Sequence, residues 1–137
     1  MTSRPPSDPV AACERPPSSA EAPSVDLFPL HDIAGDDAAI AEEIVHDLAE
    51  SAADLLARSE GALGVDDALS LTRLAHTLKG SSGIIGATSL RRCAEAIERA
   101  AVACDLATAR SRVADARRLL PATTAILRAE IERMRGA

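Results

Sequence analysis

Small aliphatic residues recur at three- and four-residue steps along the chain, from about Asp36 to Met134. This spacing places them on one side of a helix, whereas no stretch shows the alternating, β-branched pattern of a sheet. Hydrophobic residues make up 47% of the sequence and aromatic residues only 1%, so the core must consist of aliphatic side chains and alanine. Because alanine favours helix and lets helices approach closely, the sequence predicts an all-α protein.

The apolar steps divide into four segments separated by short turns. The expected helices cover about 37–59, 67–85, 88–104 and 106–134. Aspartates that can cap three of them stand just before their starts: Asp36 or Asp37, Asp66 and Asp105. The last helix should be kinked at Pro121 rather than end there, because its apolar side resumes in phase beyond that residue. Gly86 suits the left-handed exit of the second helix. A chain of 137 residues is long enough for one such core, so we expect an antiparallel up-down four-helix bundle.

The N-terminal part of the chain differs from the rest. Residues 1–25 are rich in proline, serine and alanine and have no apolar period. Such a segment buries too little surface to offset the entropy lost on ordering, so we expect a disordered leader. Residues 26–137 then form the bundle domain. Near its start, residues 25–33 are expected to form a short apolar flap, in which Phe28, the only aromatic residue, covers one end of the bundle.

Charge and apolar content exclude several classes of protein. A net charge of −6 and a pI near 5.0 argue against nucleic acid as a partner, because phosphate contacts need a basic face. No stretch approaches the roughly 18 apolar residues that a membrane span requires, and the N-terminus lacks the apolar region of a secretory signal. A cytoplasmic protein is therefore expected. The chain also has no glycine-rich nucleotide loop, so it should not phosphorylate itself from ATP.

The cysteines and two of the histidines predict no further site. Three cysteines are an odd number and do not make a disulfide framework. Cys93 and Cys104 fall about 16 Å apart along one expected helix, so they cannot pair, and we expect both to be small buried residues. His46 should lie on the solvent side of its helix, and His31 is equally weak as a site residue. No pair of histidines, or of histidine with cysteine, has metal-site spacing, so no metal is expected.

His76 is different, because it lies on the exposed side of the second expected helix. The apolar side of this helix consists of Ala68, Leu71, Leu74, Ala75, Leu78, Ser82 and Ile85. His76 points almost directly away from it, and its neighbours on the exposed side are Thr72, Arg73, Lys79, Gly80 and Gly83, with Leu69 further back. A large partner can therefore reach the imidazole.

The neighbours of His76 suit a nucleophile that attacks phosphorus. A neutral imidazole attacks through one nitrogen when the proton on the other is held by an acceptor. Lys79, three residues on, can stabilise the negative charge of an incoming phosphoryl group. Gly80, four residues on, removes a side chain that would overhang the ring, although glycine inside a helix costs about 1 kcal/mol relative to alanine. These neighbours suit an accessible nucleophilic histidine, and an ordinary solvated histidine is the other interpretation that His76 alone leaves open.

The same residues resemble a known signature. Ala75-His76-Thr-Leu78-Lys79-Gly80-Ser81-Ser82, followed by Gly86-Ala87, Leu90 and Ile97-Glu98, resembles the histidine-containing phosphotransfer (HPt) domains of bacterial phosphorelays. The resemblance implies a four-helix bundle with His76 as the phosphoacceptor and Lys79 beside it. It also implies that Glu98, on the third helix, accepts a hydrogen bond from the imidazole and orients it.

The resemblance extends to partners. It implies a monomeric phosphocarrier, rather than an autonomous enzyme, that exchanges phosphoryl groups with aspartates of receiver domains. The receiver would bring the Mg²⁺ and most catalytic groups, so no cofactor is expected in this chain. The chain departs from the family at Cys93 and Ala94, where leucine and then cysteine are frequent, and at Val102, where a second basic residue sometimes stands. Lys79 is then the main cation available to a phosphoryl group on His76.

Two other interpretations remain open. A non-catalytic helical adaptor would bind a partner through an exposed helix face, but it has no use for Gly80 next to His76. The dimerising helix pair of a sensor kinase normally has an acidic residue after the histidine, where this chain has Thr77. Leu69 is a candidate docking contact. Arg73, Arg91 and Arg99 either surround a docking surface or are solvated charges.

Overall fold

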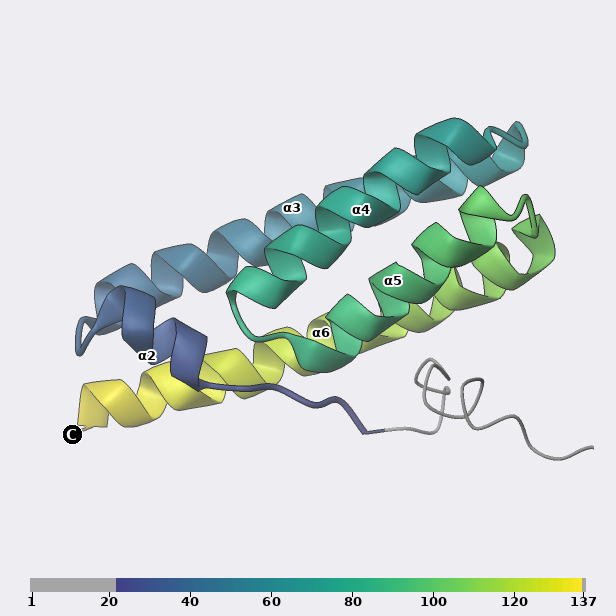
Figure 1. The fold of residues 1–137 in the computed structure, drawn as a ribbon. Coiled ribbons are helices and arrows are strands. Elements are labelled where there is room, and N and C mark those ends of the chain that lie inside the picture. Colours follow the sequence, from purple (N-terminus) through teal and green to yellow (C-terminus); the bar gives the residue numbers. More distant parts are fainter. Residues whose placement is uncertain (1–21, 137) are drawn as a thin grey trace, which may run out of the picture.

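The computed structural model describes residues 22–136, and over this range the chain forms five helices and no strand (Figure 1). The helices are α2 (Phe28–Ala34), α3 (Ala38–Gly64), α4 (Ala68–Ile84), α5 (Thr88–Val102) and α6 (Leu106–Gly136). α3 packs against α4 and α6, and α5 packs against the same two helices. The short turns between them make neighbours antiparallel. The predicted all-α, up-down four-helix bundle is confirmed.

Alanine allows the four long helices to pack closely. Each of them buries at least one alanine almost completely, namely Ala52, Ala75, Ala94 and Ala116. Leucine and isoleucine fill the remaining core, and the largest fully buried side chains include Leu56, Leu71, Leu90, Ile97, Leu119 and Leu127. The aliphatic core expected from the composition is therefore present, and no aromatic side chain contributes to it within the described range.

The first long helix ends later than predicted. α3 starts after Asp37, whose carboxylate accepts hydrogen bonds from the amides of Ala39 and Ile40. It continues to Gly64, whereas a turn was expected after about residue 59. Ala62 and Leu63 are buried, so core contacts carry the helix through a stretch whose glycines suggest a turn. The cap of α4 is correspondingly Asp67, which accepts from the amide of Ser70 at 3.0 Å, rather than Asp66.

The end of α5 differs from the prediction, whereas the cap at the start of α6 is the predicted one. α5 ends at Val102, so Cys104 lies in the following turn with φ of 58° and is exposed; its predicted burial was wrong. Cys93 is buried as expected, and desolvation raises the pKa of its thiol to about 12. Asp105 accepts from the amide of Thr108 at 3.2 Å and caps α6, which continues unbroken past Pro121.

The chain before α2 holds the turn between α4 and α5. The expected leader lies outside the described residues as far as residue 21, but Ser24 contacts the bundle. Its amide lies 2.6 Å from Ser89 Oγ, and its carbonyl accepts from the amide of Ser89. The amide of Asp26 donates to the carbonyl of Gly86 at 2.8 Å. Gly86 has φ of 82°, as predicted for the helix exit, and a Cβ there would lie only 2.0 Å from Asp26 O.

The expected flap is the helix α2, and its inward residue is not the predicted one. Leu30 is completely buried, whereas Phe28 is 70% exposed. Side chains two positions apart on a helix point about 200° away from each other, so burying Leu30 turns Phe28 outward. The prediction that Phe28 covers the end of the bundle was wrong.

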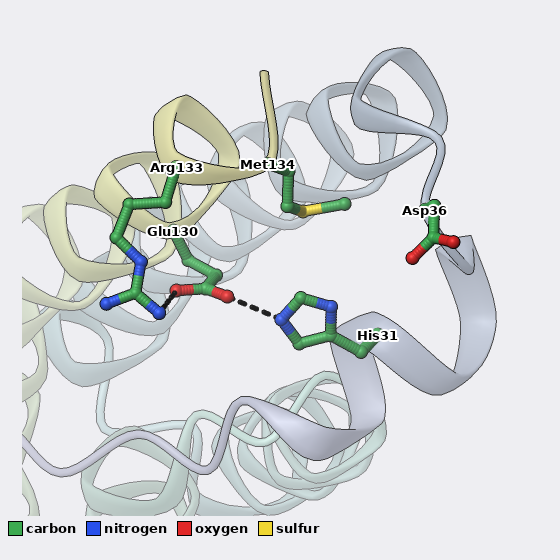
Figure 2. Close-up of a pocket in the computed structure, with 5 residues that line it drawn as sticks. All are labelled: His31, Asp36, Glu130, Arg133 and Met134. Atoms are coloured by element: carbon green, nitrogen blue, oxygen red, sulfur yellow. Dashed lines mark hydrogen bonds and ion pairs between the residues drawn. The ribbon is translucent and has the colours of Figure 1, made fainter. Parts of the chain in front are cut away.

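A buried carboxylate joins α2 to α6. Figure 2 shows Glu130 of α6 between His31 of α2 and Arg133. Glu130 Oε2 lies 2.5 Å from His31 Nε2, and its Oε1 lies 2.9 Å from a guanidinium nitrogen of Arg133. Asp36 and Met134 line the same hollow. No local pattern predicts this position for His31, because the contact joins residues far apart in the chain.

Candidate functional site

His76 lies in the middle of α4 with its ring on the surface of the bundle. Its side chain is 68% exposed, and its Nδ1 atom lies 2.9 Å from Oε2 of Glu98 on the adjacent helix α5. The ring therefore has one nitrogen turned toward the protein. The other nitrogen, Nε2, has no partner within the described part of the chain.

Glu98 binds two residues of α4 through its two oxygens. While Oε2 faces His76, Oε1 lies 2.9 Å from the ammonium of Lys79. The side chains of Glu98 and Lys79 are only 21% and 29% exposed. Three of the four predicted site residues are thus in direct contact, and the carboxylate stands between the ring and the ammonium.

The surroundings of Glu98 keep its carboxylate ionised. The hydrogen bond from Lys79 is the main effect that holds the pKa of Glu98 below its usual value of 4.5; the hydrogen bond from His76 adds to it, and partial burial opposes both. An ionised carboxylate can only accept hydrogen bonds, so the hydrogen between it and the ring belongs to Nδ1. In the neutral ring Nε2 then carries a lone pair directed at solvent.

Gly80 lies one turn beyond His76 on the exposed side of α4. A Cβ added there would meet no heavy atom within 4 Å. Internal packing therefore does not require a glycine at this position. The open space that it leaves lies next to the imidazole, where a partner would approach.

Two exposed apolar side chains lie near the site. Leu69 is two turns before His76 on α4, and Val102 is one turn beyond Glu98 on α5. Because α4 and α5 are antiparallel neighbours, both residues lie toward the same end of the site. From the sequence, Val102 was noted only as a position where the family sometimes has a basic residue. Its spacing of four residues from Glu98 could have indicated that it lies on the same face of the helix as the site.

The predicted arginines separate into two groups. Arg91 and Arg99 both form ion pairs with Glu95, at 3.6 and 3.2 Å. Arg73 is exposed and forms no ion pair with any residue between 22 and 136. His46 is exposed as predicted and lies 3.1 Å from Glu50, away from this site on α3. Within the described range, no helix combines the length and the apolarity that crossing a bilayer requires.

Comparisons with known proteins identify the family and the fold of the chain. The family model of the Hpt domain matches residues 43–137. The solved structure of histidine-containing phosphotransfer protein B from Pseudomonas aeruginosa PAO1 is similar, with a TM-score of 0.74 and 22% identity, over 82% of this chain and 98% of that one. The comparison with curated proteins finds no match. Since the family model spans most of the sequence, including His76, Lys79 and Glu98, the chain belongs to the Hpt domain family.

Proposed function

We propose that this protein carries a phosphoryl group between the aspartates of two receiver domains, with His76 as the carrier residue. The observation that supports this most is the hydrogen bond of 2.9 Å between His76 and Glu98. It holds Nδ1 and leaves the lone pair of Nε2 on the surface, in the state that a nucleophile needs. Membership of the Hpt domain family supports the same role.

The transfer begins when Nε2 of His76 attacks the phosphorus of an aspartyl phosphate. The N–P bond forms while the P–O bond to the aspartate breaks, and the released carboxylate stays on the receiver. The hydrogen on Nδ1 remains with the ring, which becomes positively charged. Glu98 accepts that hydrogen throughout, and its negative charge stabilises the imidazolium. The reverse sequence transfers the phosphoryl group to the next aspartate.

Lys79 and Gly80 have separate roles in this proposal. The ammonium of Lys79 fixes the charge of Glu98 and lies beside the ring, where it offsets the negative charge of the phosphoryl group. Gly80 leaves room for the receiver to bring its aspartate in line with Nε2. The receiver supplies Mg²⁺ and the remaining groups, so this chain is a phosphocarrier without a cofactor of its own.

Docking in this proposal uses the surface around His76. Leu69 and Val102 offer apolar area at one end of the site. In this proposal the protein acts as a monomer in the cytoplasm, where its receivers would meet it.

The proposal is tested with a cognate receiver that carries radiolabelled phosphoaspartate. Label is expected on this protein, stable to alkali and labile to acid, and absent from His76→Gln. His46→Gln is the matched control, because His46 is also an exposed helical histidine paired with a carboxylate. It should be labelled like the unmodified protein. Equal labelling of His76→Gln, or no labelling of the unmodified protein by any receiver of the host, would refute the proposal.

A further inference from the structure

Two basic residues flank His76 along α4, each one turn away. Lys79 follows it by three residues and Arg73 precedes it by three. Residues three apart are neighbours on a helix surface, so both side chains can reach the ring. They approach from opposite sides. Lys79 pairs with Glu98 of α5, whereas Arg73 lines the groove between α3 and α4, together with Arg58 and Val65.

The two cations differ in whether they form an ion pair within the described residues. The ammonium of Lys79 is held 2.9 Å from Glu98, whose negative charge offsets its own. Arg73 is exposed and makes no ion pair within residues 22–136. The nearby carboxylate of Asp67 already accepts hydrogen bonds from the amide and the hydroxyl of Ser70. Those hydrogen bonds are the main effect that lowers the pKa of Asp67, and the positive charge of Arg73 adds to it without forming an ion pair. The guanidinium can therefore still contact another anion.

A phosphoryl group on Nε2 needs such a cation. It carries about two negative charges at neutral pH, and only part of the charge of Lys79 remains to offset them. Val102, one turn beyond Glu98, offers an exposed apolar side chain instead of a base. A guanidinium has a planar set of donors that matches two phosphate oxygens at once.

We infer that Arg73 binds the phosphoryl group on His76, as a second cation on the side of the ring opposite Lys79. The inference rests on the proposed function of His76. It goes further, because it assigns the contact to the phosphorylated protein itself and not only to the complex with a receiver. Arg73 should then change the equilibrium constant for transfer between the receiver and His76, because it stabilises the free phosphorylated protein. A residue that only helps the receiver to dock would change the rates of transfer and leave this equilibrium constant unchanged.

The test is the equilibrium constant for transfer between a cognate receiver and His76, obtained from the forward and reverse rate constants at concentrations where the proteins are dissociated. In Arg73→Gln the ratio of phosphohistidine to phosphoaspartate should fall about tenfold, as expected for the loss of a hydrogen bond between charged groups. Arg128→Gln is the matched control. It removes the same charge from an exposed position on α6 and should leave the ratio unchanged.

A second measurement uses no receiver. Phosphoramidate labels His76 directly, and the extent of labelling at equilibrium should also be lower in Arg73→Gln than in Arg128→Gln. An unchanged ratio in Arg73→Gln, with or without slower transfer, would overturn the inference and make Arg73 a docking contact or a solvated charge. Failure of the proposed function looks different, because His76→Gln would then still be labelled, or the unmodified protein would not be.

Discussion

A single carboxylate organises the site at the scale of residues. Glu98 accepts from the imidazole with one oxygen and from the ammonium of Lys79 with the other. His76, Lys79 and Gly80 follow from the sequence of one helix, because their spacing fixes their common face. Glu98 was expected only through the family resemblance. It lies 22 residues away, and its contact depends on how α4 and α5 are aligned, which local spacing does not specify.

Replacing Glu98 tests its role in orienting the ring. In Glu98→Gln the amide carbonyl can still accept from Nδ1, but the negative charge is lost. We expect the rate of transfer to His76 to fall roughly 10–100-fold, as is common when the partner that orients a functional histidine is changed. Glu95→Gln, one turn earlier on α5, is the control and should transfer normally. An unchanged rate in Glu98→Gln would mean that the contact does not serve the reaction.

Gly80→Ala separates stability from access. The new methyl group has room, so α4 should become more stable by about 1 kcal/mol, measured by chemical denaturation. Transfer from a receiver should become slower, because the methyl group lies beside the approach to Nε2. Gly61→Ala on α3 also has open space and should gain similar stability with normal transfer. If Gly80→Ala transferred at the normal rate, access to Nε2 would not be the reason for the glycine at this position.

At the scale of elements, the burial of side chains determines helix ends and orientations that the local sequence does not specify. The glycines after residue 59 suggest a turn, yet buried Ala62 and Leu63 extend α3 to Gly64. Conversely, α5 stops at Val102, before the position of Cys104. α2 has only seven residues, too few for an apolar period to show that Leu30 and not Phe28 faces inward. The four long helices were predictable because their periods extend over many turns.

The attachment of α2 can be tested through His31. Its removal in His31→Ala leaves the buried carboxylate of Glu130 with Arg133 as its remaining partner in the described structure. We expect a loss of roughly 1 kcal/mol in stability and faster hydrogen exchange of the α2 amides. His46→Ala breaks only an exposed pair and should change neither. Exchange in α2 that stays the same in His31→Ala would show that the buried residues Leu30 and Ala34 hold the helix without this contact.

At the scale of the whole molecule, the segment before α2 helps to position the site. Its contacts with Gly86 and Ser89 hold the turn that joins α4 to α5, the two helices that carry His76 and Glu98. The sequence predicted the left-handed glycine but not the chain that passes against it. That approach is a contact between distant segments, and no local pattern encodes it.

Gly86→Ala measures how strongly that contact constrains the fold. Both a positive φ and a Cβ only 2.0 Å from Asp26 O oppose the substitution, so we expect a loss of about 2 kcal/mol or more. Gly35→Ala has a similar φ of 62° but open space around the new Cβ, and it should lose only about 1 kcal/mol. Equal losses, measured by denaturation, would mean that the segment moves aside at no cost.

The central claim concerns one atom, Nε2 of His76. The most direct measurement is to locate phosphorus in the phosphorylated protein by nitrogen and phosphorus NMR of the isolated product. The contact between Nδ1 and Glu98 predicts a single modified residue, His76, with the N–P bond at Nε2 and hydrogen on Nδ1. Phosphorus on Nδ1, or on any other residue, would contradict it.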